Sequence, residues 1–432
     1  MIEGTRRSVL GGIAATTATR MPLPKRAPAD VGSIESDLAR YVSFGNKRAG
    51  GAGDIACGEW LARELGKLDY KVERQQFAVP FFETVTAELA SGASTVPVYA
   101  QPIVIPTPPG GTEGPLVRVD GAGRWAGDLK GAIALVDLPS ARWSTILAKG
   151  VRQPIEAAFA AGAIAAVVVT NGPSGKVVAL NADGRRPMFA GPVALVGPAE
   201  AASFLGAAMT RERGRLVIEG RGGMRPAFNF VGRLDRGRGR WLAISTPRSG
   251  WFTCAAERGP GVAVWLGLAR WAQATFPRHD LAFVCNTGHE YEYLGAAEAM
   301  KKIAPPPNQT HFWLHLGANV AARDWHEGVP LTPLPSVDPQ RFLSISPKLL
   351  PLARQIFAGQ AGYESPVSSA VMSAGELDEV IKAGYAPAAG TFGIHRFHHT
   401  EGDDARCLNP VATAQAAEGF RRLLRAAMAQ PA

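Results

Sequence analysis

The stretch from Trp241 to Ala297 constrains the fold of this chain more than any other. Two short apolar runs, Leu242–Ser245 and Ala282–Val284, lie on either side of a segment in which apolar residues recur at helical spacing. The Gly-Pro-Gly sequence at 259–261 predicts a loop before that helix. Two buried strands joined by a helix predict a right-handed crossover in a mostly parallel sheet.

Polar residues follow both predicted strands. In parallel sheets, ligands bind beyond the carboxyl ends of the strands, so these polar residues are candidates for a site. They are Thr246, Arg248 and Ser249 after the first strand, and His289, Glu290 and Glu292 after the second.

The composition narrows the class of protein. The chain has 432 residues, 46% of them hydrophobic, which is enough for a large core and two or three domains. The net charge of +9 comes mostly from scattered arginines without a basic run, so we do not expect nucleic-acid binding. The four cysteines are widely spaced and form no metal-binding or disulfide pattern, so we expect them in the core.

The first thirty residues predict export. The segment Thr5–Leu10 resembles a twin-arginine motif, and a weakly apolar run follows it. The alternative is a disordered basic start, because Arg20 interrupts the apolar run. Export would place the protein in the periplasm or outside the cell. No stretch reaches the length of a membrane-spanning helix.

An inserted lobe is predicted at residues 97–220, between two parts of a main domain at 31–96 and 221–432. Proline and glycine cluster at its start, and short apolar strands follow, which favours a β-rich lobe. The sequence Asp128–Val136 resembles the signature of protease-associated domains.

Further along, the patterns predict a third strand over His311–Leu316 and a closing amphipathic helix over Val411–Met428. Helical spacing also predicts helices over Asp338–Phe342 and Leu349–Phe357.

Almost everything after residue 33 resembles the zinc aminopeptidases of peptidase family twenty-eight, whose relatives include glutamate carboxypeptidase, glutaminyl cyclase and the transferrin receptor. The matching motifs are Asn229–Gly232, the helix that begins near Gly261, the Glu-x-x-x-Leu-Gly loop at 290–295, and the His-Thr-x-x-Asp sequence at 399–403. The resemblance implies a mixed, mostly parallel α/β/α sandwich with two zinc ions.

Two of the family's metal-ligand positions are lost in this sequence. The resemblance implies five ligands, and the first, a histidine, falls on Pro247, which cannot bind a metal. The aspartate after the third strand falls on Gly317. One of the two zinc sites is therefore expected to be dismantled.

The remaining positions imply a single zinc ion. The bridging aspartate falls on Glu257, the glutamate of the next pair on Glu290, and the last histidine on His399. Two carboxylates and one imidazole suit Zn²⁺ with an open fourth position, similar to glutaminyl cyclase. The family's general base falls on His289, and imidazole has a pKa suited to that role.

Two arginines flank the altered positions. Arg248 or Arg258 could fill the space of the missing metal and hold a carboxylate, either that of Glu290 or of a substrate. The alternative is that these arginines form structural ion pairs.

Other residues are candidates for supporting the site or contacting substrate. Ser249 or Cys254 is also a weak candidate nucleophile. The supporting candidates are Ser249, Trp251, His315, His395 and His398.

Two classes of function follow. The first is an exported hydrolase of peptide or amide bonds in small substrates, with one zinc ion. The second is a non-catalytic binding protein on a peptidase scaffold, as in the transferrin receptor. Glutaminyl cyclisation is a third, weaker hypothesis. Fold alone does not separate them.

Overall fold

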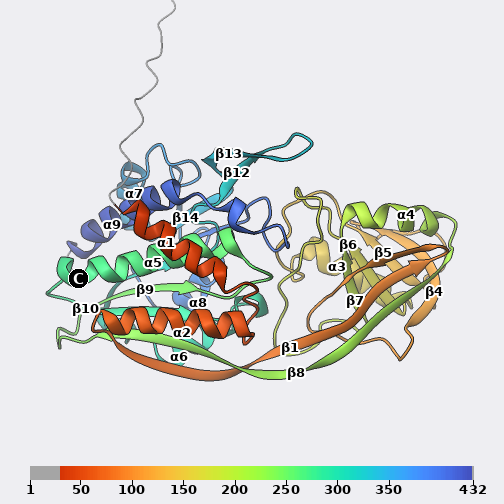
Figure 1. Ribbon diagram of the computed structural model, residues 1–432, viewed down its shortest axis with the longest axis horizontal. Helices are drawn as coiled ribbons and strands as arrows, with labels where there is room; N and C mark the ends of the chain where they lie inside the picture. Colours follow the sequence, from red (N-terminus) through yellow and green to blue (C-terminus); the bar gives the residue numbers. More distant parts are fainter. Residues whose placement is uncertain (1–29, 431–432) are drawn as a thin grey trace, which may run out of the picture.

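The computed structural model describes residues 30–430. Figure 1 shows two bodies that lie end to end and are joined by the long strands β1 (Lys71–Ser91) and β8 (Arg213–Leu234). These strands pair antiparallel over almost their whole length, with one irregularity between Thr84 and Thr86. The twin-arginine segment lies outside the described residues.

The larger body is built on a mixed, mostly parallel sheet. β9 pairs in parallel with both β10 and β11, and β11 pairs in parallel with β16, while β8 and β14 run antiparallel to their neighbours at either side. The strands are β9 (Trp241–Pro247), β10 (Asp280–Asn286), β11 (Thr310–Leu316), β14 (Arg341–Ile345), β15 (Val367–Ser368) and β16 (Ala388–Gly393). A separate hairpin consists of β12 (Arg323–His326) and β13 (Thr332–Val337).

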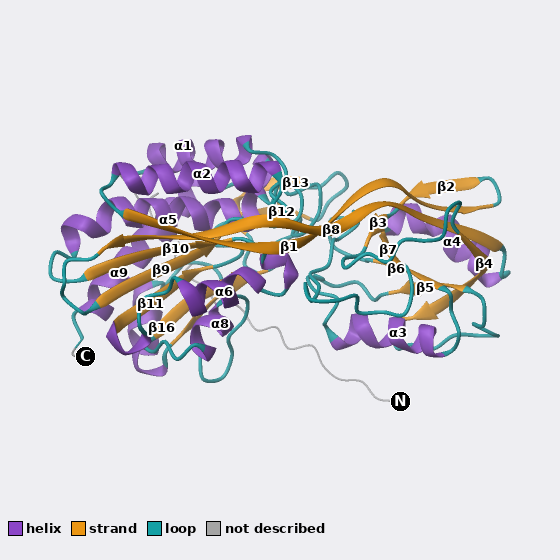
Figure 2. Cartoon of the chain, turned by 90° about the horizontal axis from the view of Figure 1, so that it is seen from below, coloured by secondary structure: helices purple, strands orange, loops and turns teal. Residues whose placement is uncertain are grey.

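Helices cover both faces of this sheet, as Figure 2 shows. One face carries α1 (Val31–Ser43), α2 (Ala52–Lys67), α5 (Ala255–Thr275), α7 (Leu350–Ile356) and α9 (Pro410–Met428), which pack in the largest hydrophobic cluster. The other carries α6 (Leu294–Lys302) and α8 (Leu377–Lys382) over a second cluster. The predicted three-layer α/β/α fold is confirmed. None of the helices among residues 30–430 is long and apolar enough to cross a membrane.

The helix after β9 begins earlier than predicted. α5 starts at Ala255, so the predicted loop at 259–261 lies within the helix. Gly261 lets the helix approach β11 closely, because a Cβ there would lie 3.1 Å from the carbonyl oxygen of Leu316. The early start places Glu257 and Arg258 in the first turn of the helix, where its buried end meets the strand ends.

Residues 338–342 were wrongly predicted as a helix. β14 begins at Arg341 and pairs antiparallel with β16, so the sheet overrides the local helical spacing. The predicted helices at Leu349–Phe357 and Val411–Met428 are confirmed as α7 and α9.

The smaller body is an α/β lobe with its own core. β4, β5, β6 and β7 form a parallel sheet, with β3 antiparallel at the edge of β7. Hydrophobic clusters cover both faces of this sheet. Its elements are β2 (Ser94–Pro97), β3 (Tyr99–Ala100), β4 (Thr112–Asp120), β5 (Ile133–Asp137), α3 (Lys149–Ala160), β6 (Ala165–Val169), β7 (Val193–Val196) and α4 (Pro198–Met209).

Four short 3₁₀ turns complete the described elements. They are η1 (His289–Tyr291), η2 (Pro307–Gln309), η3 (Pro347–Leu349) and η4 (Ala405–Cys407).

Candidate functional site

The carboxyl ends of the central strands meet as the sequence predicts. Asn286 at the end of β10 is the partner of Pro247 at the end of β9, and β11 runs parallel to β9 on its other side. The backbone amide of Arg248 donates to the carbonyl of Asn286, 2.9 Å away. The loops after β9 and β10 are therefore held together at one edge of the sheet.

Glu257 and His399 meet at this edge although 142 residues separate them. His399 Nε2 lies 3.2 Å from Glu257 Oε1, and its Nδ1 lies 3.0 Å from the carbonyl oxygen of Ala179 in the lobe. His398 is the third member of the group: one ligand atom from each of Glu257, His398 and His399 lies within 4.8 Å of the others. All three side chains are buried.

Arg258 is paired with Glu257 in the centre of this group. Its Nη2 lies 2.6 Å from Glu257 Oε1, and both side chains are 0% exposed. Its Nε donates to the carbonyl of Ser249, 3.2 Å away. Burial opposes ionisation of Glu257, but the charges of Arg258 and His399 outweigh it and hold the pKa of Glu257 well below its usual range. The pair is therefore charged.

Glu290, predicted as a metal ligand, is not part of the group formed by Glu257 and His399. Its Oε1 accepts from the backbone amide of Ala49 at 2.6 Å, and its Oε2 accepts from the hydroxyl of Ser249 at 2.8 Å. Both carboxylate oxygens are thus used inside the protein. The predicted zinc centre of Glu257, Glu290 and His399 stays a prediction, and the three potential ligands that lie together here are Glu257, His398 and His399.

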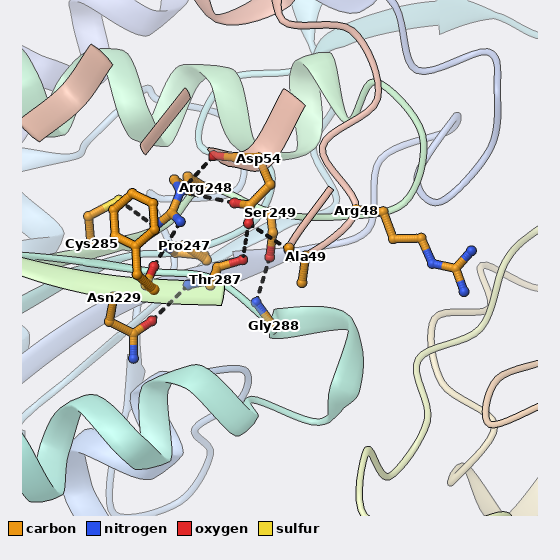
Figure 3. Close-up of polar contacts among 12 residues, drawn as sticks. Arg48, Ala49, Asp54, Asn229, Pro247, Arg248, Ser249, Cys285, Thr287 and Gly288 are labelled. Carbon is orange, nitrogen blue, oxygen red and sulfur yellow. Dashed lines mark hydrogen bonds and ion pairs between the residues drawn. The ribbon is translucent and has the colours of Figure 1, made fainter. Parts of the chain in front are cut away.

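Ser249 serves as a link between two loops rather than as a nucleophile. Its hydroxyl donates to Glu290 at 2.8 Å. It also accepts from the backbone amide of Gly288 at 2.8 Å, a contact that Figure 3 shows. The side chain of His289 makes no contact with this hydroxyl among the described residues, so Ser249 lacks the neighbouring base that a nucleophilic serine needs. The other candidate nucleophile, Cys254, is fully buried, and burial raises the pKa of its thiol to about 12.

Arg248 forms a structural ion pair. Figure 3 shows its guanidinium directed at Asp54 of α2, with Nε 2.9 Å from Asp54 Oδ1. A second nitrogen donates to the carbonyl of Phe228 at 2.8 Å. Asp54 also accepts from Thr287 and from the backbone amide of Gly50. These contacts join α2 to the loops after β9 and β10. The ion-pair partner of Arg248 is therefore Asp54 and not Glu290.

A metal ion does not fit among the three grouped residues as they are arranged. The rings of His398 and His399 are stacked, with centroids 3.8 Å apart and planes 21° apart, so one ring would have to turn before both could direct a lone pair at one ion. The guanidinium of Arg258 already neutralises Glu257. A zinc ion would therefore have to displace a buried cation.

The two lost ligand positions have structural roles. Pro247 is the last residue of β9. Gly317 follows β11, and its amide donates to the hydroxyl of Thr391 at 2.9 Å. A Cβ at Gly317 would overlap the carbonyl oxygen of Thr391, so the backbone here leaves no room for an aspartate.

His289 forms a second polar pair, with Glu376. Its Nδ1 lies 3.2 Å from Glu376 Oε1, and Glu376 Oε2 accepts from Asn286 at 3.0 Å. The Nε2 atom of His289 has no hydrogen-bond partner within residues 30–430, and the side chain is 9% exposed. Burial and the charge of Arg258 together lower the pKa of His289 to about 4, against the opposing effect of Glu376.

Glu376 was not among the predicted site residues. It lies in the loop before the short helix α8, 87 residues from His289, and no motif surrounds it. Only the pairing of strands along the sheet brings this loop to the strand ends. A weak signal existed in the acidic residue between a Ser-Ala-Gly turn and a helix.

The remaining candidates support the site from its periphery. His315 Nδ1 lies 2.9 Å from Ser245 Oγ within the sheet. His395 Nε2 lies 3.2 Å from Asp403 Oδ2, and Asp403 accepts from the first backbone amides of α5. Trp251 does not line an open pocket, because it is 1% exposed and donates to Asn181 of the lobe at 2.9 Å.

The lobe covers this edge of the sheet. Its loops at 138–148 and 170–182 contact the main body: Ser144 Oγ lies 3.4 Å from His398 Nε2, and the Ala182 amide donates to the carbonyl of Glu290. Arg142 bonds both oxygens of Asp338 at 2.8 Å. The lobe therefore packs against the loops that carry Glu290 and His398, at the edge of the sheet where Glu257 and Arg258 lie.

No family model matches the chain. No curated protein matches it either.

Solved structures do match over nearly the whole chain. A zinc aminopeptidase from Bacillus subtilis has a TM-score of 0.72 and 16% identity, covering 93% of this chain and 96% of its own. An aminopeptidase from an Aneurinibacillus species has a TM-score of 0.67 and 15% identity, with 92% and 94% covered. A precursor from Shewanella amazonensis, of peptidase family twenty-eight, has a TM-score of 0.71 and 18% identity, with 94% of both chains covered. The chain thus has the fold of the zinc aminopeptidases, as its motifs predict.

Proposed function

We propose that the protein hydrolyses amide or peptide bonds in small substrates, with His289 as the general base. The observation that carries this proposal is the His289–Glu376 pair, in which a carboxylate holds one ring nitrogen and the other ring nitrogen has no hydrogen-bond partner within residues 30–430. An orienting carboxylate behind an imidazole is the arrangement that general-base histidines use. The aminopeptidases that share the fold act on the same class of bond.

The proposed reaction uses water as its only co-reactant. His289 Nε2 takes a proton from water as the water oxygen attacks the carbonyl carbon of the substrate. The tetrahedral intermediate then expels the amine, and the proton held by His289 passes to that nitrogen. One C–O bond forms and one C–N bond breaks. Glu376 fixes the ring and stabilises its charged form while the proton is held.

The test is hydrolysis of a panel of aminoacyl amides and short peptides by the purified protein. We expect His289→Ala to lower kcat/KM by about 10²- to 10⁴-fold, the usual contribution of a general base. Glu376→Gln should also lower kcat, with KM nearly unchanged, because it disturbs the orientation of His289 and not the binding of the substrate. His326→Ala, an exposed histidine of β12, is the matched control and should have no effect.

The second candidate is a non-catalytic binding protein, and the burial of Glu257 and Arg258 favours it. It predicts no turnover on the panel, with His289→Ala changing nothing. The panel includes a peptide with N-terminal glutamine, so that release of ammonia by a cyclase reaction would be detected.

Export is also part of this proposal, because the twin-arginine motif at Arg6–Arg7 supports it. Fractionation of cells that express the full chain tests it. We expect the protein in the periplasm or medium, and retention in the cytoplasm when both arginines are replaced by lysine.

A further inference from the structure

The first turn of α5 carries a positive charge of the protein's own at the place where the related aminopeptidases keep zinc. Glu257 falls on the bridging carboxylate of that family, and His399 on its last histidine ligand. Both side chains are present and in contact, 3.2 Å apart. The group that lies against their shared oxygen is the guanidinium of Arg258, 2.6 Å from Glu257 Oε1.

Arg258 is not an ordinary structural arginine. Arg248, directly after β9, is an ordinary structural arginine, because Asp54 and the carbonyl of Phe228 accept from its nitrogens. In Arg258, by contrast, Nη1 is fully buried with no acceptor among the described residues, and Nη2 has only the ion pair with Glu257. A buried donor without an acceptor is costly, and such groups concentrate where a ligand or reacting group completes them.

The carboxylates around Arg258 need a positive charge to balance them. Two carboxylates, Glu257 and Glu376, raise the pKa of Arg258 against the opposing effect of burial. The guanidinium therefore supplies the balancing charge for these acids, which an ion would otherwise have to supply.

We propose that the guanidinium of Arg258 replaces the metal ions of the zinc aminopeptidases, so that this site works without a bound metal ion. The absence of metal-binding side chains at positions 247 and 317 agrees with this proposal, because a site without an ion needs no ligands there. If the proposed hydrolysis is correct, the unpaired Nη1 donor would serve to stabilise the oxyanion of the tetrahedral intermediate, the task that zinc performs in metallopeptidases. This catalytic role rests on the proposed function, whereas the replacement of the metal does not.

The experiment measures metal content and affinity, with zinc by elemental analysis and Co²⁺ by its absorption spectrum. Full-length wild-type protein, loaded with either metal and then dialysed, should retain far less than one ion per chain. Arg258→Ala frees Glu257, His398 and His399, so it should bind Co²⁺ about 10- to 100-fold more tightly, the range by which neighbours tune metal sites. Arg258→Lys keeps the charge and should match the wild type. Arg270→Ala is the matched control, because it removes an ion-paired arginine from the same helix.

Two results would overturn the proposal. One is a wild-type protein that retains about one zinc ion per chain and loses it with Glu257→Gln. The other is an Arg258→Ala protein, folded by circular dichroism, with no gain in affinity. If Arg258→Ala does not fold, the proposal is tested by the metal content of the wild type and by the Co²⁺ affinity of Arg258→Gln, which also removes the positive charge. A protein that hydrolyses nothing but gains a metal on Arg258→Ala would refute the proposed function and support the replacement.

Discussion

Charged residues in this site are buried in pairs, and the choice of partner decides what each can do. Glu257 is paired with Arg258, Arg248 with Asp54, and His395 with Asp403. Because leaving one member of such a pair uncompensated costs several kcal/mol, each pair constrains its neighbours strongly. His289 differs, since one of its ring nitrogens is free.

The low pKa of His289 predicts the pH dependence of activity. Its imidazole is the free base above about pH 4 in the folded protein. We therefore expect the acid limb of kcat/KM near pH 4, well below the value of about 6.5 for an ordinary histidine. A pH–rate profile with its acid limb near 6.5 would show that another histidine, or none, serves as the base.

His315 predicts a pH dependence of stability. Burial lowers its pKa to about 4, whereas the unfolded chain has a value of about 6.5. The unfolded chain thus binds the extra proton between these values, and stability falls as pH drops from about 6.5 to 4, by up to about 3 kcal/mol. Thermal unfolding of His315→Asn should show a shallower loss over this window. An unchanged slope would refute the assignment.

Gly317 predicts the outcome of restoring a side chain at a lost ligand position. Because a Cβ there would overlap the carbonyl oxygen of Thr391, Gly317→Ala should destabilise the protein by about 1–3 kcal/mol. Gly267→Ala is the control, since Gly267 lies in α5 with open space around it and alanine favours a helix by about 1 kcal/mol. Equal melting temperatures for the two variants would contradict this account.

Some of the site could be predicted from single residues and some could not. The resemblance placed Glu257, His399 and His289 at one edge of the sheet, and the structure brings Glu257 and His399 into contact. It did not reveal that Glu290 turns to Ala49, or that Glu376 joins His289. These contacts depend on loop conformations, which no spacing along the chain encodes.

At the level of elements, the start of α5 positions the site. Asp403, from the loop after β16, accepts from the backbone amides of Ala256 and Glu257 at 2.8 and 3.0 Å. A carboxylate at a helix N-terminus satisfies free amides and the positive end of the helix dipole. This contact fixes Glu257 against His399 from outside the helix.

Asp403→Ala should therefore loosen the site as well as the fold. We expect a loss of about 1–2 kcal/mol in unfolding free energy, the usual cost of removing a cap. Asp404→Ala is the control, because its pair with Arg406 is exposed and contributes less than about 1 kcal/mol. Chemical denaturation measures both, and an equal loss for the two variants would contradict a capping role for Asp403.

The order of helices and strands was largely predictable, because the spacing of apolar residues shows which face of a segment is buried and so whether it forms a strand or a helix. Failures occurred where long-range pairing decides. The segment predicted as a helix at 338–342 instead leads into β14, which joins the sheet by pairing with β16. Partners so distant in sequence leave no local signal.

For the whole molecule, the lobe is held against the edge of the sheet that carries the site. Arg142 crosses from the lobe to Asp338, whose side chain is 0% exposed, and to the carbonyl of Ile394 at 2.6 Å. Arg142→Ala would leave the buried carboxylate of Asp338 without its charged partner and weaken this contact between the bodies. We expect faster hydrogen exchange in the loops at 138–148 and 170–182. Arg118→Ala, which removes an ion pair within the lobe, should leave exchange in the 170–182 loop unchanged.

The central claim is that Arg258 lies where a metal ion lies in the aminopeptidases of this fold. The most direct measurement is anomalous diffraction at the zinc edge from crystals of the wild-type protein soaked in zinc chloride. We expect no anomalous peak among Glu257, His398 and His399, and density for a guanidinium against Glu257. A peak at that point, with Arg258 turned away from Glu257, would contradict the account.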